Sequence, residues 1–135
     1  MPKQYLQPSE LFASQPFGFT QVVTSPPGKL VFCSGQVAWD KELKLVGGTD
    51  LAAQATKALE NLKHALAEAG GTPADVTSLR IYIVDYKPEY SGQLAPALGP
   101  FLDGATPPAQ TLIGVQALAV PGLMIEIEAM AVVND

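Results

Sequence analysis

The sequence of residues 123–133 is LMIEIEAMAVV, and its central part, residues 125–128, alternates between isoleucine and glutamate. Ile125 and Ile127 fall on one side of an extended chain, whereas Glu126 and Glu128 fall on the other, because successive side chains of a strand point to opposite faces. The alternation predicts a strand with one buried face. It also places two carboxylates about 7 Å apart, which suits general acid–base chemistry, a carboxylate-bound metal ion or simply a solvated sheet face.

A second alternating stretch and a long periodic stretch supply neighbours for this strand. Residues 76–84 alternate in the same way and predict another strand with one buried side. Between residues 50 and 69, apolar side chains recur at spacings of three and four, which predicts a helix. Thr49 or Asp50 can cap its start, and the glycines that follow residue 69 end it. The apolar stripe of this helix is expected to pack on the sheet.

The region before the helix predicts a β-hairpin. Residues 18–23 and 30–39 are rich in valine and aromatic side chains, and the turn-like sequence Ser-Pro-Pro-Gly at residues 25–28 lies between them. Residues 1–16 contain three prolines and show little periodicity, so we expect an irregular N-terminal arm there.

The remaining segments complete an α+β fold. After Pro88, apolar residues recur at helical spacing, but two glycines and two prolines predict a poor or broken helix. Residues 111–115 predict one more strand. The predicted order is ββαβαββ, and 135 residues are enough for one domain, residues 1–135.

Composition excludes several classes of function. Eight Lys plus Arg against thirteen Asp plus Glu give a net charge of −5, and Arg80 is the single arginine, so we expect no nucleic-acid partner. No apolar stretch reaches the roughly 20 residues that span a bilayer, and the N-terminus lacks the features of a secretory signal. We therefore expect a cytoplasmic protein with no membrane partner. The single cysteine, Cys33, and the single histidine, His64, cannot form a zinc site, so we expect no metal.

Two short stretches carry polar residues where a ligand could bind. Gly35, in the Ser34-Gly35-Gln36 stretch, lies inside a predicted strand, where glycine marks a bulge or the close approach of a ligand or backbone. Residues 107–110 read PPAQ and form a rigid, extended approach to the next strand. This approach either presents Gln110 at the rim of a pocket or serves only as a connector.

Five stretches, taken together, resemble one known family. They are Leu30 to Gln36, Gln54 to Leu62 with its ALENL ending, Asp85 after an alternating strand, the Pro108-Ala109 pair, and Ile125 to Ala129. In order and spacing they resemble the RidA family, also called the YjgF/YER057c/UK114 family, over about residues 17–133. The resemblance implies a chorismate-mutase-like sheet with two helices on one face, assembled as a homotrimer with small-molecule clefts between subunits. It also implies the hydrolysis of reactive imines and enamines without a cofactor.

The resemblance assigns roles to individual residues, and one position departs from the family. The best-known members bind the substrate carboxylate through an arginine in a P-A-R-[ST] motif, where this chain has Gln110. Glu126 would hold the attacking water or its proton, so the expected catalytic residues are Glu126 and Gln110. The expected ligand-binding residues are Phe19, Ser34, Gly35, Gln93 and Leu112.

Two interpretations of the function stay open at this point. Gln110 offers hydrogen bonds but no charge, and losing a charge-assisted pair costs about 1.5–3 kcal/mol. The chain is then either an imine or enamine deaminase with altered specificity, or a trimeric protein that binds a small metabolite or acts as a holdase without catalysis. Arg80 would replace the missing charge only if it reached the site, and a surface ion pair is its more common role. The endoribonuclease activity attributed to some relatives fits poorly with a net charge of −5.

Overall fold

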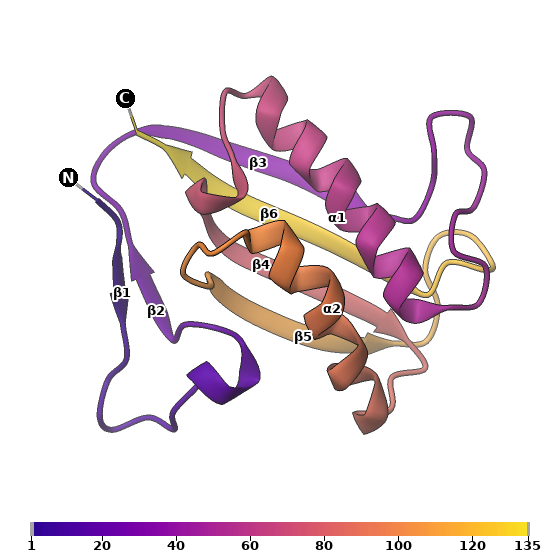
Figure 1. Ribbon diagram of the computed structural model, residues 1–135, viewed down its shortest axis with the longest axis horizontal. Helices are drawn as coiled ribbons and strands as arrows, with labels where there is room; N and C mark the ends of the chain where they lie inside the picture. Colours follow the sequence, from indigo (N-terminus) through magenta and orange to yellow (C-terminus); the bar gives the residue numbers. More distant parts are fainter. Residues whose placement is uncertain (1, 135) are drawn as a thin grey trace.

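The computed structural model describes residues 2–134 and contains a four-stranded mixed sheet, a separate two-stranded sheet and two α-helices (Figure 1). β6 (Ile125–Val133) lies between β3 (Lys29–Gln36) and β4 (Val76–Val84) and is antiparallel to both. β5 (Ala109–Val115) pairs in parallel with β4 as an outer strand. The isoleucines of β6 are buried and its glutamates lie on the other face, as the alternation predicts.

α1 (Leu51–Glu68) is the long helix that the apolar spacing predicts. The Asp50 side chain caps it by accepting hydrogen bonds from the backbone N–H groups of Ala52 and Ala53, which satisfies donors that have no partner within the helix. Gly70, with a φ of 79°, follows its end in the left-handed region that favours glycine. The buried side of α1 packs on β3 and β6.

α2 (Ser91–Leu102) differs from the broken helix that the sequence predicts, because it runs continuously for 12 residues despite Pro96 and Pro100. Both prolines are exposed, so their rings face away from the protein interior. The opposite side of α2 buries Leu94, Ala97 and Phe101 in the hydrophobic core, and this burial offsets the two missing backbone donors. Both helices cover the same face of the sheet (Figure 1).

The predicted hairpin before α1 is wrong. β2 (Val22–Thr24) pairs with β1 (Gln4–Leu6) and not with β3, so the arm expected to be irregular contributes a strand. Tight two-residue hairpin turns need positive φ angles that proline cannot adopt, and consecutive prolines 26 and 27 instead lead the chain away from β2. The amide of Asn134 donates to the carbonyls of both prolines and holds this connection in place.

The architecture is therefore the predicted α+β, chorismate-mutase-like one with an additional N-terminal strand. One hydrophobic cluster fills the space between the helices and the sheet. Within residues 2–134, neither helix has the length and apolar character needed to cross a membrane. No element of residues 2–134 covers the sheet face that points away from the helices, and we call it the open face (Figure 1). It carries Leu30, Phe32, Ser34, Arg80, Tyr82, Glu126, Glu128 and Met130.

Candidate active site

A cleft of about 1020 Å³ lies between the N-terminal segment, α2 and the outer strand β5. Phe12, Phe17 and Phe19 line it on one side, and Gln110 and Leu112 line it from β5. None of the lining residues within residues 2–134 has a charged side chain. The cleft is therefore an apolar site with a small number of neutral hydrogen-bonding groups.

Hydrogen bonds to the residues just before β5 and within the N-terminal segment fix the aromatic side of the cleft. The backbone N–H of Thr20 donates to the carbonyl of Pro108 at 3.0 Å, and its hydroxyl donates to the carbonyl of Pro107 at 2.5 Å. The buried Ser14 hydroxyl donates to the carbonyl of Phe19 at 2.6 Å. These bonds tie the segment that carries the phenylalanines to the residues just before Gln110.

The phenylalanines form an edge-to-face cluster. The ring centroid of Phe12 lies 6.0 Å from that of Phe17 and 6.1 Å from that of Phe19, with interplanar angles of 80° and 72°. Aromatic rings prefer such arrangements because the positive edge of one ring meets the negative face of another. Phe12 and Phe17 were absent from the sequence-based prediction, because the N-terminal arm shows no periodicity that would assign them to a site.

Strand register determines which side of the sheet Gln110 faces. Gln110 is paired with Leu79 of β4, and Leu112 with Ile81. Leu79 and Ile81 are buried beneath the helices, and paired residues on neighbouring strands point to the same face. Gln110 and Leu112 therefore face the helix side, where Phe19 joins them in the cleft. Gln93 is half-buried on α2 but is not among the residues that line this cleft.

The other expected site residues lie on the open face. The register of β3 shifts between Cys33 and Gln36, so Gly35 lies within a bulge. A bulge is one of the two features that a glycine inside a strand indicates, and the close approach of another group is the other. A Cβ atom added to Gly35 would overlap the carboxylate of Glu126. The bare backbone of Gly35 thus makes room for Glu126, and Ser34 is exposed beside it.

The expected site residues consequently form two groups on opposite sides of the sheet. Phe19, Gln110 and Leu112 meet in the cleft, whereas Glu126 is paired with Tyr82 of β4 and lies on the open face with Ser34. Within one chain, the side chains of Gln110 and Glu126 cannot contact the same small molecule. A site that uses both groups requires a second copy of the chain.

The open face also carries polar residues that the sequence-based prediction left without a role. The Tyr82 hydroxyl donates a hydrogen bond to the Glu128 carboxylate, and this bond, with burial and the charge of Glu128, raises the pKa of Tyr82. Arg80, by contrast, lowers the pKa of Tyr82 through its hydrogen bond and its charge. Arg80 is paired with Thr111 and Glu128, so it lies on the open face and does not supply a charge to the cleft beside Gln110.

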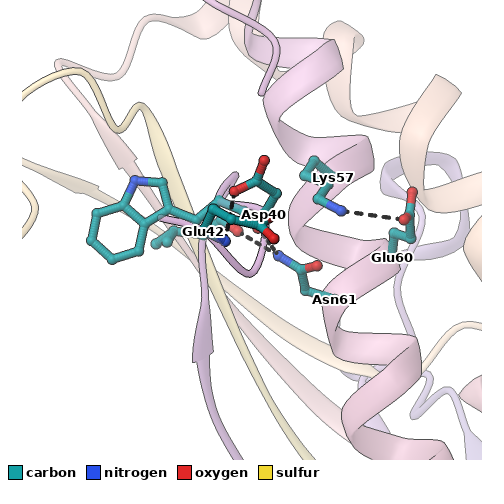
Figure 2. Close-up of polar contacts among 7 residues, drawn as sticks. Asp40, Glu42, Lys57, Glu60 and Asn61 are labelled. Atoms are coloured by element: carbon teal, nitrogen blue, oxygen red, sulfur yellow. Dashed lines mark hydrogen bonds and ion pairs between the residues drawn. The ribbon is translucent and has the colours of Figure 1, made fainter. Parts of the chain in front are cut away.

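A smaller cavity of about 410 Å³ lies between the loop after β3 and α1. Figure 2 shows Asn61 of α1 pointing toward this loop, where its amide donates to the carbonyls of Val37 and Trp39 at 2.9 and 2.8 Å. Asp40 accepts hydrogen bonds from two backbone N–H groups of the same loop at 2.9 Å. These polar groups stabilise the loop, and His64 at the rim is exposed on the solvated helix face where the periodicity places it.

Comparisons with known proteins agree with this architecture. The family model described as endoribonuclease L-PSP matches residues 12–133. The crystal structure of YyfB from Yersinia pestis, a protein of unknown function in the conserved Rid family, is 45% identical, has a TM-score of 0.93, and the match covers 98% of this chain and 100% of that chain.

Two further proteins show weaker similarity. Protein DfrA of Myxococcus xanthus is 35% identical over 115 residues, which cover 84% of both proteins. RidA from the Antarctic bacterium Psychrobacter sp. PAMC 21119 is 27% identical, with a TM-score of 0.69 over 85% of this chain and 88% of that chain. Because the family match spans nearly the whole sheet and both helices, this chain belongs to the endoribonuclease L-PSP family, the family of the Rid proteins.

Proposed function

We propose that this protein hydrolyses small reactive imines or enamines in clefts that form between the subunits of a homotrimer. The observation that carries the proposal is the division of the site residues between two faces of one sheet. Gln110 lies in the apolar cleft and Glu126 lies on the open face, so only an assembly of several copies can bring the two groups to one ligand.

The open face has the character of an assembly surface. Phe32 is 68% exposed there, and Leu30 and Met130 are exposed beside it. Apolar side chains grouped on an uncovered sheet face favour burial against a partner. In the proposed trimer, the copy seated on this surface brings its cleft close to Glu126, and cyclic symmetry buries the same surface on every subunit.

The proposed reaction needs only orientation, water and proton transfer. Water adds across the C=N bond of an imine, the nitrogen takes up a proton, and ammonia then leaves as the carbonyl C=O forms. Glu126, supplied by the neighbouring copy, transfers one proton from the attacking water to the nitrogen and then a second from the hydroxyl of the adduct, so that ammonia leaves as the C=O bond forms. An enamine first becomes the imine by moving its N–H proton to carbon. Gln110 donates a hydrogen bond through its side-chain amide and orients the substrate in the cleft.

Specificity follows from the neutral side chain at position 110. An arginine binds a carboxylate through two charge-assisted hydrogen bonds, whereas the Gln110 amide contributes one or two neutral ones. The preferred substrates are therefore imines that lack a carboxylate beside the reacting carbon. The lack of any charged side chain along the cleft, within residues 2–134, supports this preference.

The test measures ammonia and carbonyl product released from freshly generated imines, one series neutral and one carboxylated. We expect wild-type turnover of the neutral series and a fall of about 100-fold in Glu126→Gln. Glu128→Gln is the matched control, because Glu128 lies on the same strand and face two residues away. Gln110→Arg should shift the preference toward carboxylated imines by about 10- to 100-fold.

Two results would count against the proposal. Full turnover in Glu126→Gln would remove the role of that carboxylate, and a mass of 14.2 kDa in solution would remove the intersubunit site. The alternative is a trimeric binding protein without catalysis, which the uncharged cleft also suits. Its signature is thermal stabilisation by a ligand without product formation, because a ligand that binds only the native state raises its stability by mass action.

A further inference from the structure

We infer that the ligand of the cleft is an uncharged molecule with an aromatic ring, and that Phe12 and Phe17 bind this ring. The inference deepens the proposed function, because it names the substrate class of the same cleft. Binding of unreactive probes tests it separately from turnover.

The charges at the site favour an uncharged ligand over an anion, because this chain contributes no charged lining residue within residues 2–134 and the group that the proposed assembly adds is the Glu126 carboxylate, which repels an anion. The polar side chains that line the cleft within residues 2–134 are amides and hydroxyls, such as those of Gln110 and Ser91. An ionised carboxylate that leaves water needs a cation to offset its lost hydration. Lys87 does not line the cleft, and its ammonium lies 3.9 Å from the Asp85 carboxylate and 5.9 Å from the Tyr90 ring centroid. An uncharged ligand avoids this unfavourable desolvation.

The aromatic cluster favours a ligand that contains a flat ring. Phe12 and Phe17 line the cleft and are 62% and 68% exposed in the single chain, so much of their apolar surface is left uncovered by the chain itself. A flat ring that enters the cleft covers this surface and extends the edge-to-face packing that Phe12 already makes with Phe17 and Phe19. Tyr86 lines the cleft as a further aromatic residue.

The volume and anchoring of the cleft favour a ring-bearing ligand over a molecule of a few atoms. About 1020 Å³ is at the upper end of the roughly 300–1,000 Å³ typical of pockets for organic ligands. The bonds of Ser14 and Thr20 fix the backbone on both sides of Phe17. The backbone that carries Phe17 is thus held in place before a ligand arrives, which lowers the entropic cost of binding.

The experiment compares three unreactive probes by isothermal titration calorimetry at neutral pH. Phenylacetamide and phenylacetate have nearly the same shape and differ in charge, and acetamide lacks the ring. We expect wild-type protein to bind phenylacetamide at least tenfold more tightly than either of the other probes. Phe12→Leu and Phe17→Leu should each weaken phenylacetamide binding about three- to tenfold, because leucine keeps the apolar volume and loses the ring.

Leu43→Ala is the matched control, since Leu43 is 70% exposed, about as much as Phe17, and lies in the loop after β3, outside both the cleft and the open face. It should bind phenylacetamide as the wild type does at unchanged oligomeric mass. Tighter binding of phenylacetate, equal binding of acetamide, or unchanged affinity in both cleft variants would overturn the inference. Preferential binding of phenylacetamide without turnover of any imine would refute the proposed function and leave this inference standing.

Discussion

Replacing Gln54 by alanine should strongly destabilise the fold, because this buried amide binds three backbone groups that lie on two separate segments of the chain. Its side chain is 0% exposed. Its Nε2 donates to the carbonyls of Gly48 at 2.7 Å and Gly122 at 3.0 Å, and its Oε1 accepts from the N–H of Met124 at 2.9 Å. Gln54 therefore holds the start of α1 against the loop that leads into β6, the strand that carries Glu126.

The magnitude follows from these contacts. Gln54→Ala removes a fully buried amide and leaves two carbonyls and one N–H without their partner, and each lost bond costs about 1 kcal/mol. Three bonds and the cavity left by the shortened side chain together give a loss of about 3–5 kcal/mol in the free energy of unfolding. Asn61→Ala is the control, because Asn61 also donates two amide hydrogen bonds but is partly exposed, so water can replace them. We expect that variant to lose about 1 kcal/mol in the free energy of unfolding.

Urea-induced unfolding, followed by circular dichroism at one fixed protein concentration, measures both values. A fixed concentration matters because assembly contributes to apparent stability. A loss below about 1 kcal/mol for Gln54→Ala, or a loss no larger than that of Asn61→Ala, would refute the reasoning that the buried Gln54 side chain makes three bonds that water does not replace.

Three further predictions concern the open face and strand β3. Gly35→Ala should displace Glu126 and lower imine turnover at least tenfold while the midpoint of urea unfolding changes little; wild-type turnover would contradict the steric argument. The hydrogen bond to Glu128 holds the pKa of Tyr82 above 10.0, so the stability that it contributes is present at neutral pH and is lost as the pH rises through the folded-state pKa. Ultraviolet titration should show this pKa falling in Glu128→Gln, and no change would argue against the bond. Burial raises the pKa of Cys33, so iodoacetamide should alkylate the native thiol more slowly than the urea-unfolded one at pH 8; equal rates would contradict its burial.

The sequence predicts the central elements well because their signals are local. The alternation around Ile125 and Ile127 and the apolar stripe of α1 both report which side chains are buried, and the structure confirms both elements. The signal at Gly35 is also local, since glycine within a strand indicates that another group comes close. The identity of that group, Glu126, follows only from the register between β3 and β6.

The features that the sequence does not predict are contacts between segments that lie far apart in the chain. The composition around Val22 predicts a strand correctly but contains no information about its partner, so the pairing of β2 with β1 was missed. The placement of Gln110 and Glu126 on opposite faces depends on their registers with β4. Phe12 and Phe17 enter the cleft through a non-periodic segment that is fixed by contacts to Pro107 and Pro108, far along the chain.

The prolines of α2 give the two walls of the cleft different mechanical properties. Pro96 and Pro100 lack backbone N–H groups, so the carbonyls four residues before them accept no helical hydrogen bond. α2 is thus the compliant wall, whereas β5 is held along its length by its ladder with β4. Hydrogen–deuterium exchange would register this contrast as faster opening of α2 than of the strands. Ligands of different width can then be accommodated by movement of the helix while the strand keeps Gln110 in position.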